Sequence, residues 1–143
     1  MTGTPGTGKT VVAKRIAKQK HYAYLDVKTL IKNFKLNKKY DRKRKTWLVD
    51  VDRLNKALVS VVAAAKIAKA KGIVIDSHLA HYLPKRYVDL CIVTRTEPKK
   101  LYPRLKKRKY SKLKIDENME AEIMQVILEE ARSLKHNIKV VWT

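Results

Sequence analysis

The stretch from Gly3 to Thr10, with the sequence Gly-Thr-Pro-Gly-Thr-Gly-Lys-Thr, has the residue spacing of a phosphate-binding loop. Its glycines permit a backbone turn that directs several N–H groups at one phosphate, and a following helix adds its N-terminal partial positive charge. In this pattern Lys9 reaches the β- and γ-phosphates of a nucleotide, and the Thr10 hydroxyl faces magnesium. Because such a loop joins a strand to a helix, the motif predicts an α/β fold.

Hydrophobic periodicity behind the loop predicts helices and short strands in alternation. Helices are expected over 9–20, 28–35, from Asp50 or Asp52 to about Lys71, over 97–108, and from Asp116 to about Lys135. Strands are expected over 22–27, 73–75, 88–94 and 137–142. Residues 37–46 show no periodicity and are expected to form a mobile basic connection, and Pro103 is expected to bend or weaken its helix. Apolar strands alternating with helices predict a P-loop three-layer α/β/α fold, with a parallel sheet covered on both faces.

The chain of 143 residues contains no linker and is expected to form a single domain over 1–143. Only Met1 and Thr2 precede the loop, and the chain stops directly after its last strand. The strand that should feed the loop and a C-terminal helix are therefore expected to be missing. Loss of a central strand would expose strand edges and leave the fold marginally stable.

Lysine and arginine number 34 against 13 acidic residues, a formal net charge of +21. Such a surface attracts polyanions, and nucleic acid is the obvious partner class, although a lysine-rich solvated surface has the same composition. Tyr40 and Trp47 flank the basic stretch and can stack on a base. The chain lacks an apolar run of the roughly 18 residues that a membrane span needs, so a cytoplasmic location without membrane contact is expected.

Three further positions carry side chains suited to phosphoryl chemistry. Asp76 follows an apolar strand, where ligands bind in open α/β sheets, and a carboxylate there can hold magnesium or cap a helix. His78 can orient water or move a proton, although a surface role and competition from the nearby His81 stay open. Arg104 and Arg108 lie four residues apart on one helix face, which suits charge on a transferring phosphoryl group, a solvated surface or RNA contact.

Several stretches together resemble one known family. They are Thr2–Thr10, Gly72–His78, Leu83–Leu90, Arg95–Pro98, Leu101–Leu105, Arg108–Ser111 and Glu117–Ile123. With these stretches the chain resembles the adenylate kinase isoenzyme 6 family, small P-loop kinases and ATPases linked to ribosome assembly, and its archaeal members in particular. The resemblance spans essentially the whole chain.

The resemblance implies a nucleoside monophosphate kinase fold with an AMP-binding segment at about 26–49 and a short lid at about 107–117. It implies an ATP-binding set of Gly6, Gly8, Lys9, Thr10, Val11 and Arg108. Thr10 and Asp76 are the implied magnesium ligands. The implied catalytic residues are Lys9, Asp76, His78 and Arg104, with His78 associated with ATP hydrolysis.

The implied reaction converts ATP and AMP into two ADP with Mg²⁺, and a slower ATPase activity accompanies it. The implied partners are ribosomal RNA, through small-subunit maturation and 16S rRNA processing, and the ribosomal protein uS11. The alternative is a non-catalytic or weakly active, ATP-switched RNA-binding assembly factor, which the basic charge favours. The sequence leaves the preferred acceptor nucleotide and the oligomeric state open.

Overall fold

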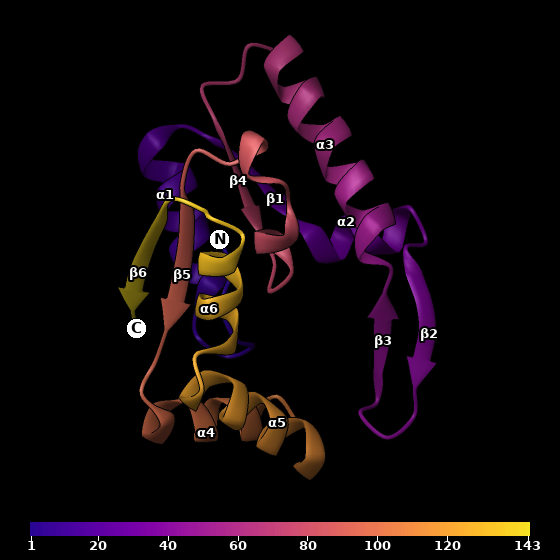
Figure 1. The fold of residues 1–143 in the computed structure, drawn as a ribbon, viewed down its shortest axis with the longest axis vertical. Coiled ribbons are helices and arrows are strands. Elements are labelled where there is room, and N and C mark those ends of the chain that lie inside the picture. The colour runs from indigo at the N-terminus through magenta and orange to yellow at the C-terminus, as the bar shows by residue number, and fades with distance from the viewer.

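A computed structural model describes residues 1–143 as an α/β fold (Figure 1). The strands are β1 (Ala23–Asp26), β2 (Asn37–Asp41), β3 (Thr46–Val49), β4 (Ile73–Asp76), β5 (Cys91–Arg95) and β6 (Ile138–Trp142). The helices are α1 (Lys9–Lys20), α2 (Val27–Asn33), α3 (Val51–Ile67), α4 (Pro98–Lys107), α5 (Lys112–Ile123) and α6 (Val126–Ser133), with 3₁₀ turns at Ala80–Tyr82 and Lys85–Tyr87. None of the helices combines the length and apolarity that a bilayer span requires.

Two parallel strand pairs, β1 with β4 and β5 with β6, form the central layer. Met1 and Thr2 lie between these pairs. The Met1 amino group donates to the Ile75 carbonyl at 2.9 Å on one side. On the other side, the Thr2 N–H donates to Ile92 and the Thr2 carbonyl accepts from Thr94, both at 2.9 Å. No regular strand feeds the loop, as expected, but two residues occupy the central position and connect the pairs.

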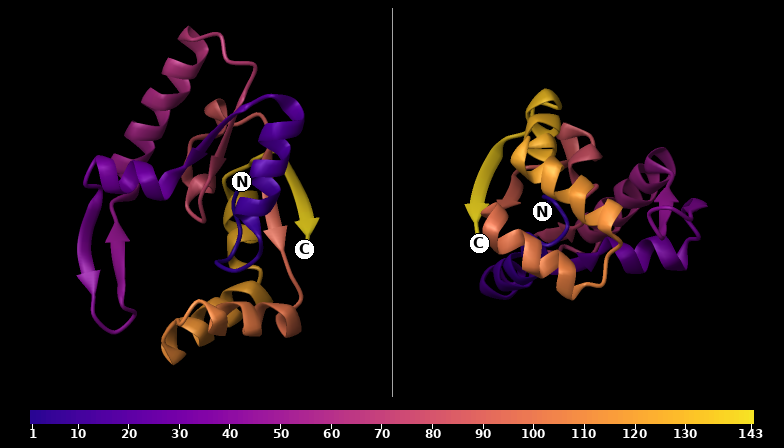
Figure 2. Two further views of the ribbon diagram at one scale, coloured as in Figure 1. Left: turned by 180° about the vertical axis from the view of Figure 1, so that it is seen from behind. Right: turned by 90° about the horizontal axis from the view of Figure 1, so that it is seen from below.

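Helices cover both faces of this layer, which confirms the predicted arrangement. Helix α1 lies behind β5 in Figure 1 and in front in the reversed view of Figure 2, whereas α6 lies on the opposite face. Ala13 of α1 packs against Val74, and Leu128 of α6 packs against Cys91 and Val93. The two helices thus pack on opposite faces of the strands on either side of the loop entry.

The largest apolar cluster lies away from the loop and joins α2 and α3 to the rest of the chain. Its buried members are Val27, Leu30, Leu36, Leu54, Leu58 and Leu83. A fully buried leucine contributes about 2 kcal/mol relative to an exposed one, so this cluster fixes the base of the 26–49 segment. That segment consists of α2 and the β2–β3 hairpin. The segment 107–117 forms the turn between α4 and α5 together with the first half of α5.

The expectation of a mobile basic connection over 37–46 was wrong. Strands β2 and β3 pair in antiparallel fashion, with Tyr40 opposite Trp47 and Asp41 opposite Thr46. All of β2 except Asp41 is exposed, so the hairpin has no buried face to produce an alternating apolar pattern. Its turn also contains no glycine. The left-handed position, with φ of 49°, is taken by Lys45 instead. Both usual sequence signals for a hairpin are therefore absent.

The helix predicted from Asp116 to Lys135 is two helices. Helix α5 begins earlier, capped by Ser111, whose hydroxyl accepts from the Lys114 N–H. The chain then breaks at Gln125, which has a left-handed φ of 58° and starts α6. Helix α4 runs through Pro103 without interruption, so the expected distortion does not end the helix.

Candidate nucleotide-binding site

The loop from Gly3 to Gly8 turns from the central layer into α1, and its glycines are required by the backbone. Gly3 has φ of 135°, and a Cβ atom there would lie 2.4 Å from the carbonyl oxygen of Thr94. Gly8, with φ of 78°, precedes the first residue of α1 in a left-handed conformation that other residues adopt at a cost of about 1–2 kcal/mol. The loop therefore leads from the central layer directly into the N-terminus of α1, which is the connection that phosphate binding needs.

Lys9 folds back across the loop. Its Nζ donates to the carbonyl oxygens of Gly3 at 2.8 Å and Thr4 at 3.0 Å. Burial lowers the pKa of Lys9 to about 8, an effect that the nearby Asp76 carboxylate opposes. The ammonium group is therefore held beside the loop, charged near neutral pH, and able to exchange carbonyl oxygens for phosphate oxygens.

Asp76 lies at the C-terminal end of β4, as predicted, and is buried. Its Oδ2 accepts a hydrogen bond from the Tyr24 hydroxyl at 2.9 Å. Burial and this hydrogen bond raise the pKa of Tyr24, and the nearby Thr10 side chain opposes that rise. Tyr24 therefore holds the carboxylate of Asp76, one of the two predicted magnesium ligands.

The donor set at this point suits magnesium. Asp76 and Thr10 supply a carboxylate and a hydroxyl oxygen, and Mg²⁺ is usually held by one or two protein oxygens together with water and substrate phosphates. The chain contains no group of three or more His, Cys, Asp and Glu residues that would form an all-protein metal site. The residues thus fit an ion that arrives with a nucleotide.

The two histidines near the end of β4 have different environments. His78 is exposed, yet partial desolvation, together with the charges of Lys9 and Lys28, lowers the pKa of His78 to about 4. Its imidazole is therefore neutral near pH 7 and can accept a hydrogen bond. His81 is buried, with Nδ1 2.8 Å from the Thr2 hydroxyl and Nε2 3.0 Å from the Glu130 carboxylate. His81 is thus committed to structural contacts, which leaves His78 as the candidate.

The two candidate arginines of α4 also differ. Arg104 donates through Nη1 to the Gly6 carbonyl at 3.4 Å and to the Thr143 hydroxyl at 3.0 Å, so it braces the outer side of the loop. Arg108 is exposed at the end of α4, and its charge lowers the pKa of Lys9. The guanidinium of Arg108 forms no ion pair within the chain.

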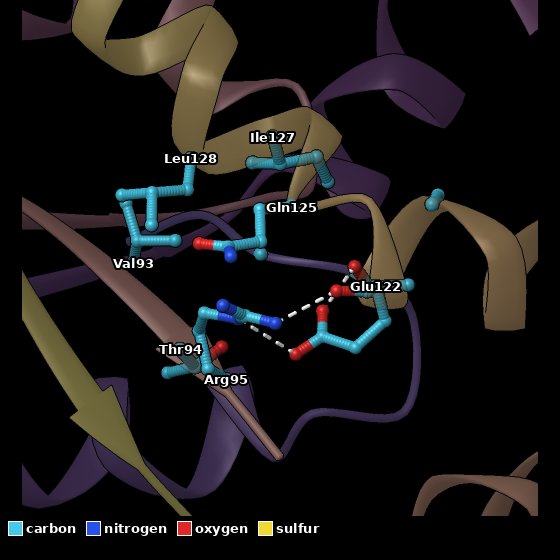
Figure 3. Close-up of a pocket in the computed structure, with 10 residues that line it drawn as sticks. Val93, Thr94, Arg95, Glu122, Gln125, Ile127 and Leu128 are labelled. Carbon is cyan, nitrogen blue, oxygen red and sulfur yellow. Dashed lines mark hydrogen bonds and ion pairs between the residues drawn. The ribbon is translucent and has the colours of Figure 1, made fainter. Parts of the chain in front are cut away.

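A tight crevice without room for a water molecule lies behind the loop and is lined in part by Gly3 and Thr4. Figure 3 shows Arg95 within it, hydrogen-bonded to Glu122. Sequence spacing had marked neither Glu122 nor Tyr24, because each reaches the site from a distant part of the chain. Glu122 lies inside the predicted helix from Asp116 to Lys135 and Tyr24 inside the predicted strand over 22–27, so neither position carried a signal for the site.

Comparison with known proteins gives a consistent family. A family model described as an AAA domain matches residues 1–125. The adenylate kinase isoenzyme 6 homolog of Dictyostelium discoideum is 39% identical over 141 residues, which span 98% of this chain and 77% of that protein. The homolog of the same name from Schizosaccharomyces pombe is 41% identical and spans 91% of this chain and 71% of that protein. The chain belongs to the adenylate kinase isoenzyme 6 family.

Membership of the adenylate kinase isoenzyme 6 family confirms the resemblance drawn from the sequence and agrees with the P-loop fold. The family extends to archaea. A Pyrococcus furiosus protein that carries an adenylate kinase name is 40% identical to this chain, and the match covers 96% of this chain and 70% of that protein.

Proposed function

We propose that residues 1–143 form a magnesium-dependent adenylate kinase domain that transfers the γ-phosphoryl group of ATP to AMP and yields two ADP. The observation that carries this proposal is the built phosphate-binding loop. In it, Lys9 is held by the Gly3 and Thr4 carbonyls beside the buried Asp76. The names of the family relatives support the same reaction class.

The chain's own residues supply most of the charge stabilisation. The amides after Gly6 and Gly8 and the N-terminus of α1, including Val11, hold the ATP phosphates, and Lys9 exchanges its carbonyl partners for phosphate oxygens. A phosphate oxygen of AMP attacks the γ-phosphorus, and the bond from phosphorus to the bridging oxygen breaks as ADP leaves. Magnesium, held by Thr10 and Asp76, neutralises phosphate charge when bound. Arg108 adds positive charge from the lid.

The remaining candidates have supporting roles. Arg104 braces the loop through the Gly6 carbonyl, so it keeps the loop amides directed at phosphate. The 26–49 segment provides the AMP site with α2 and the β2–β3 hairpin. The imidazole of His78 orients water in the slower ATPase reaction by accepting a hydrogen bond from it, because its pKa of about 4 leaves it neutral near pH 7.

Product analysis tests this function. Purified chain is incubated with magnesium and ATP, with and without AMP, beside Lys9→Ala and the exposed α1 control Lys18→Ala. We expect two ADP formed for each AMP lost, at least a roughly hundredfold loss in Lys9→Ala, and little change in Lys18→Ala. Phosphate release that is independent of AMP would favour the ATPase alternative, and absence of turnover in the unaltered chain would refute the kinase assignment.

A second function, RNA contact during small-subunit maturation, is favoured by the β2–β3 hairpin. Residues 37–49 contain six Lys or Arg and one Asp. Tyr40 and Trp47 are both exposed, with ring centroids 5.2 Å apart. Lysines around an exposed aromatic pair suit phosphate contacts combined with base stacking. We propose a cytoplasmic role beside ribosomal RNA and the protein uS11, in which ATP turnover accompanies 16S rRNA processing.

Fluorescence of Trp47 tests the RNA contact. The variant Trp142→Phe leaves Trp47 as the only tryptophan, and a single-stranded oligouridylate is expected to quench it. Replacing Lys39, Lys43 and Lys45 by Gln should lower the salt dependence of binding, d log K/d log[salt], by about 2. The matched triple change of Lys66, Lys69 and Lys71, which lie at and beyond the end of α3, should leave quenching intact. Equal weakening by both triple variants would indicate general polyanion attraction instead.

A further inference from the structure

Glu122 in the last turn of α5 is a buried carboxylate that the proposed reaction does not use. It is 3% exposed. Oε2 accepts from the Thr4 hydroxyl at 2.6 Å, and Oε1 accepts from the Thr96 N–H at 3.0 Å and from Arg95 Nε at 3.1 Å. Arg95 also donates through Nη2 to the Glu122 backbone carbonyl at 2.7 Å (Figure 3). A buried charge with this many donors is held in one position.

Thr4 connects this carboxylate to the phosphate-binding residues. The Thr4 hydroxyl is bound to Glu122, while the Thr4 carbonyl accepts from Lys9 Nζ at 3.0 Å and from the Thr7 hydroxyl at 2.8 Å. The same residue therefore bonds to α5 with its side chain and to the loop lysine with its backbone. A shift of Thr4 would move the resting position of Lys9 and the course of the loop.

We propose that Glu122 is a positioning residue for the phosphate-binding loop, acting through Thr4. It touches no substrate, but it fixes the first half of the loop to α5, the helix that follows the lid turn at 108–111. This inference rests on the proposed function in that the loop binds ATP. Its consequence is selective, because loss of the contact disturbs the ATP phosphates and leaves the AMP segment at 26–49 unaffected.

Two shape-conserving variants test the contact. Glu122→Gln lacks the charge and cannot accept from all three donors, and Thr4→Val removes the hydroxyl at nearly constant volume. Each is expected to raise the equilibrium Kd and the KM for ATP about tenfold, with the KM for AMP changed less than about twofold. The double variant should bind ATP no more weakly than either single variant, because both remove the same contact.

Leu128→Ala is the control for fold stability. Leu128 is buried against Cys91 and Val93 and its side chain takes no part in the hydrogen bonds of Glu122 or Thr4, so the variant should lower stability without changing the KM for ATP at a temperature where circular dichroism shows it folded. Additive effects in the double variant, equal rises in both KM values, or the same ATP defect in Leu128→Ala would overturn the proposal. If Glu122→Gln fails to fold, Thr4→Val alone decides the outcome. ATP binding is measured without turnover, so a chain that binds ATP but forms no ADP would contradict the kinase assignment and still test Glu122.

Discussion

At the scale of single residues, Lys9 is the group whose ionisation is most directly coupled to nucleotide binding. Its folded pKa is about 8, below the ordinary 10.5, because burial disfavours the charge. Anionic phosphates favour that charge, so ATP binding near pH 8.5 should take up a fraction of a proton. Calorimetry in two buffers of different ionisation enthalpy measures this uptake. An uptake that persists unchanged in Lys9→Met would assign it to another group.

The same pKa has a consequence for the ligand-free fold. Between about pH 8 and 10.5 the unfolded chain holds more protons at Lys9 than the folded chain does. The contribution of this residue to the free energy of unfolding therefore rises with pH through that window. Urea titrations at pH 8 and pH 10 should show a smaller rise in Lys9→Met than in the unaltered chain, and equal rises would contradict the assignment.

Sequence spacing marked candidate site residues that belong to a local pattern and did not mark those brought to the site by the fold. Lys9 and Thr10 belong to one contiguous motif, and the apolar strand before Asp76 marked its place. Glu122 reaches the loop over 118 positions of sequence, and Tyr24 reaches Asp76 over 52. Neither contact has a spacing rule, because both depend on how α5 and β1 pack beside the loop.

At the scale of elements, the break between α5 and α6 yields a stability prediction. Gln125 is exposed and left-handed, a conformation that costs non-glycine residues about 1–2 kcal/mol. Gln125→Gly relieves this strain but gains entropy in the unfolded chain, so we expect a net stabilisation of about 0.5 kcal/mol. Gln125→Val should instead destabilise by about 1 kcal/mol, since a branched side chain fits this region poorly. Urea unfolding measures both, and a Val variant as stable as the Gly variant would show that the break carries no strain.

Elements were predictable where one face is buried and unpredictable where it is exposed. Helix α1 was expected over 9–20 and forms over Lys9–Lys20, because Val12, Ala13 and Ala17 are buried at helical spacing. The β2–β3 hairpin is exposed on nearly every residue, and the helix breaks at Lys69 and Gln125 use left-handed residues other than glycine. Periodicity and glycine position carry no signal in such places.

At the scale of the whole molecule, the alternation of short apolar strands with helices was sufficient for the layered fold, since parallel pairing buries both strand faces. The connection at the centre was not predictable from that pattern. Met1 and Thr2 are too short a segment to register as a strand, yet their backbone groups bond to both β4 and β5. The Thr2 hydroxyl also hydrogen-bonds with His81 Nδ1, and His81 Nε2 lies 3.0 Å from Glu130, so His81 ties the loop entry to α6.

The net charge of +21 is a property of the whole molecule and gives the last prediction. Among the 34 lysines and arginines, only Arg44, Arg95, Lys100 and Arg132 lie within 4 Å of a carboxylate. Most of the positive charge is therefore balanced only by solvent ions, and the compact state concentrates its self-repulsion. Raising potassium chloride from 10 to 100 mM shortens the screening length from about 30 Å to about 10 Å, and should raise the free energy of unfolding by on the order of 1–2 kcal/mol. Urea titrations at the two salt concentrations measure this, with pH held at 7 so that Lys9 stays charged in both states. A fall in stability with salt would mean that attraction in the few ion pairs, such as Arg95 with Glu122, adds more to the free energy of unfolding than repulsion among the excess cations removes.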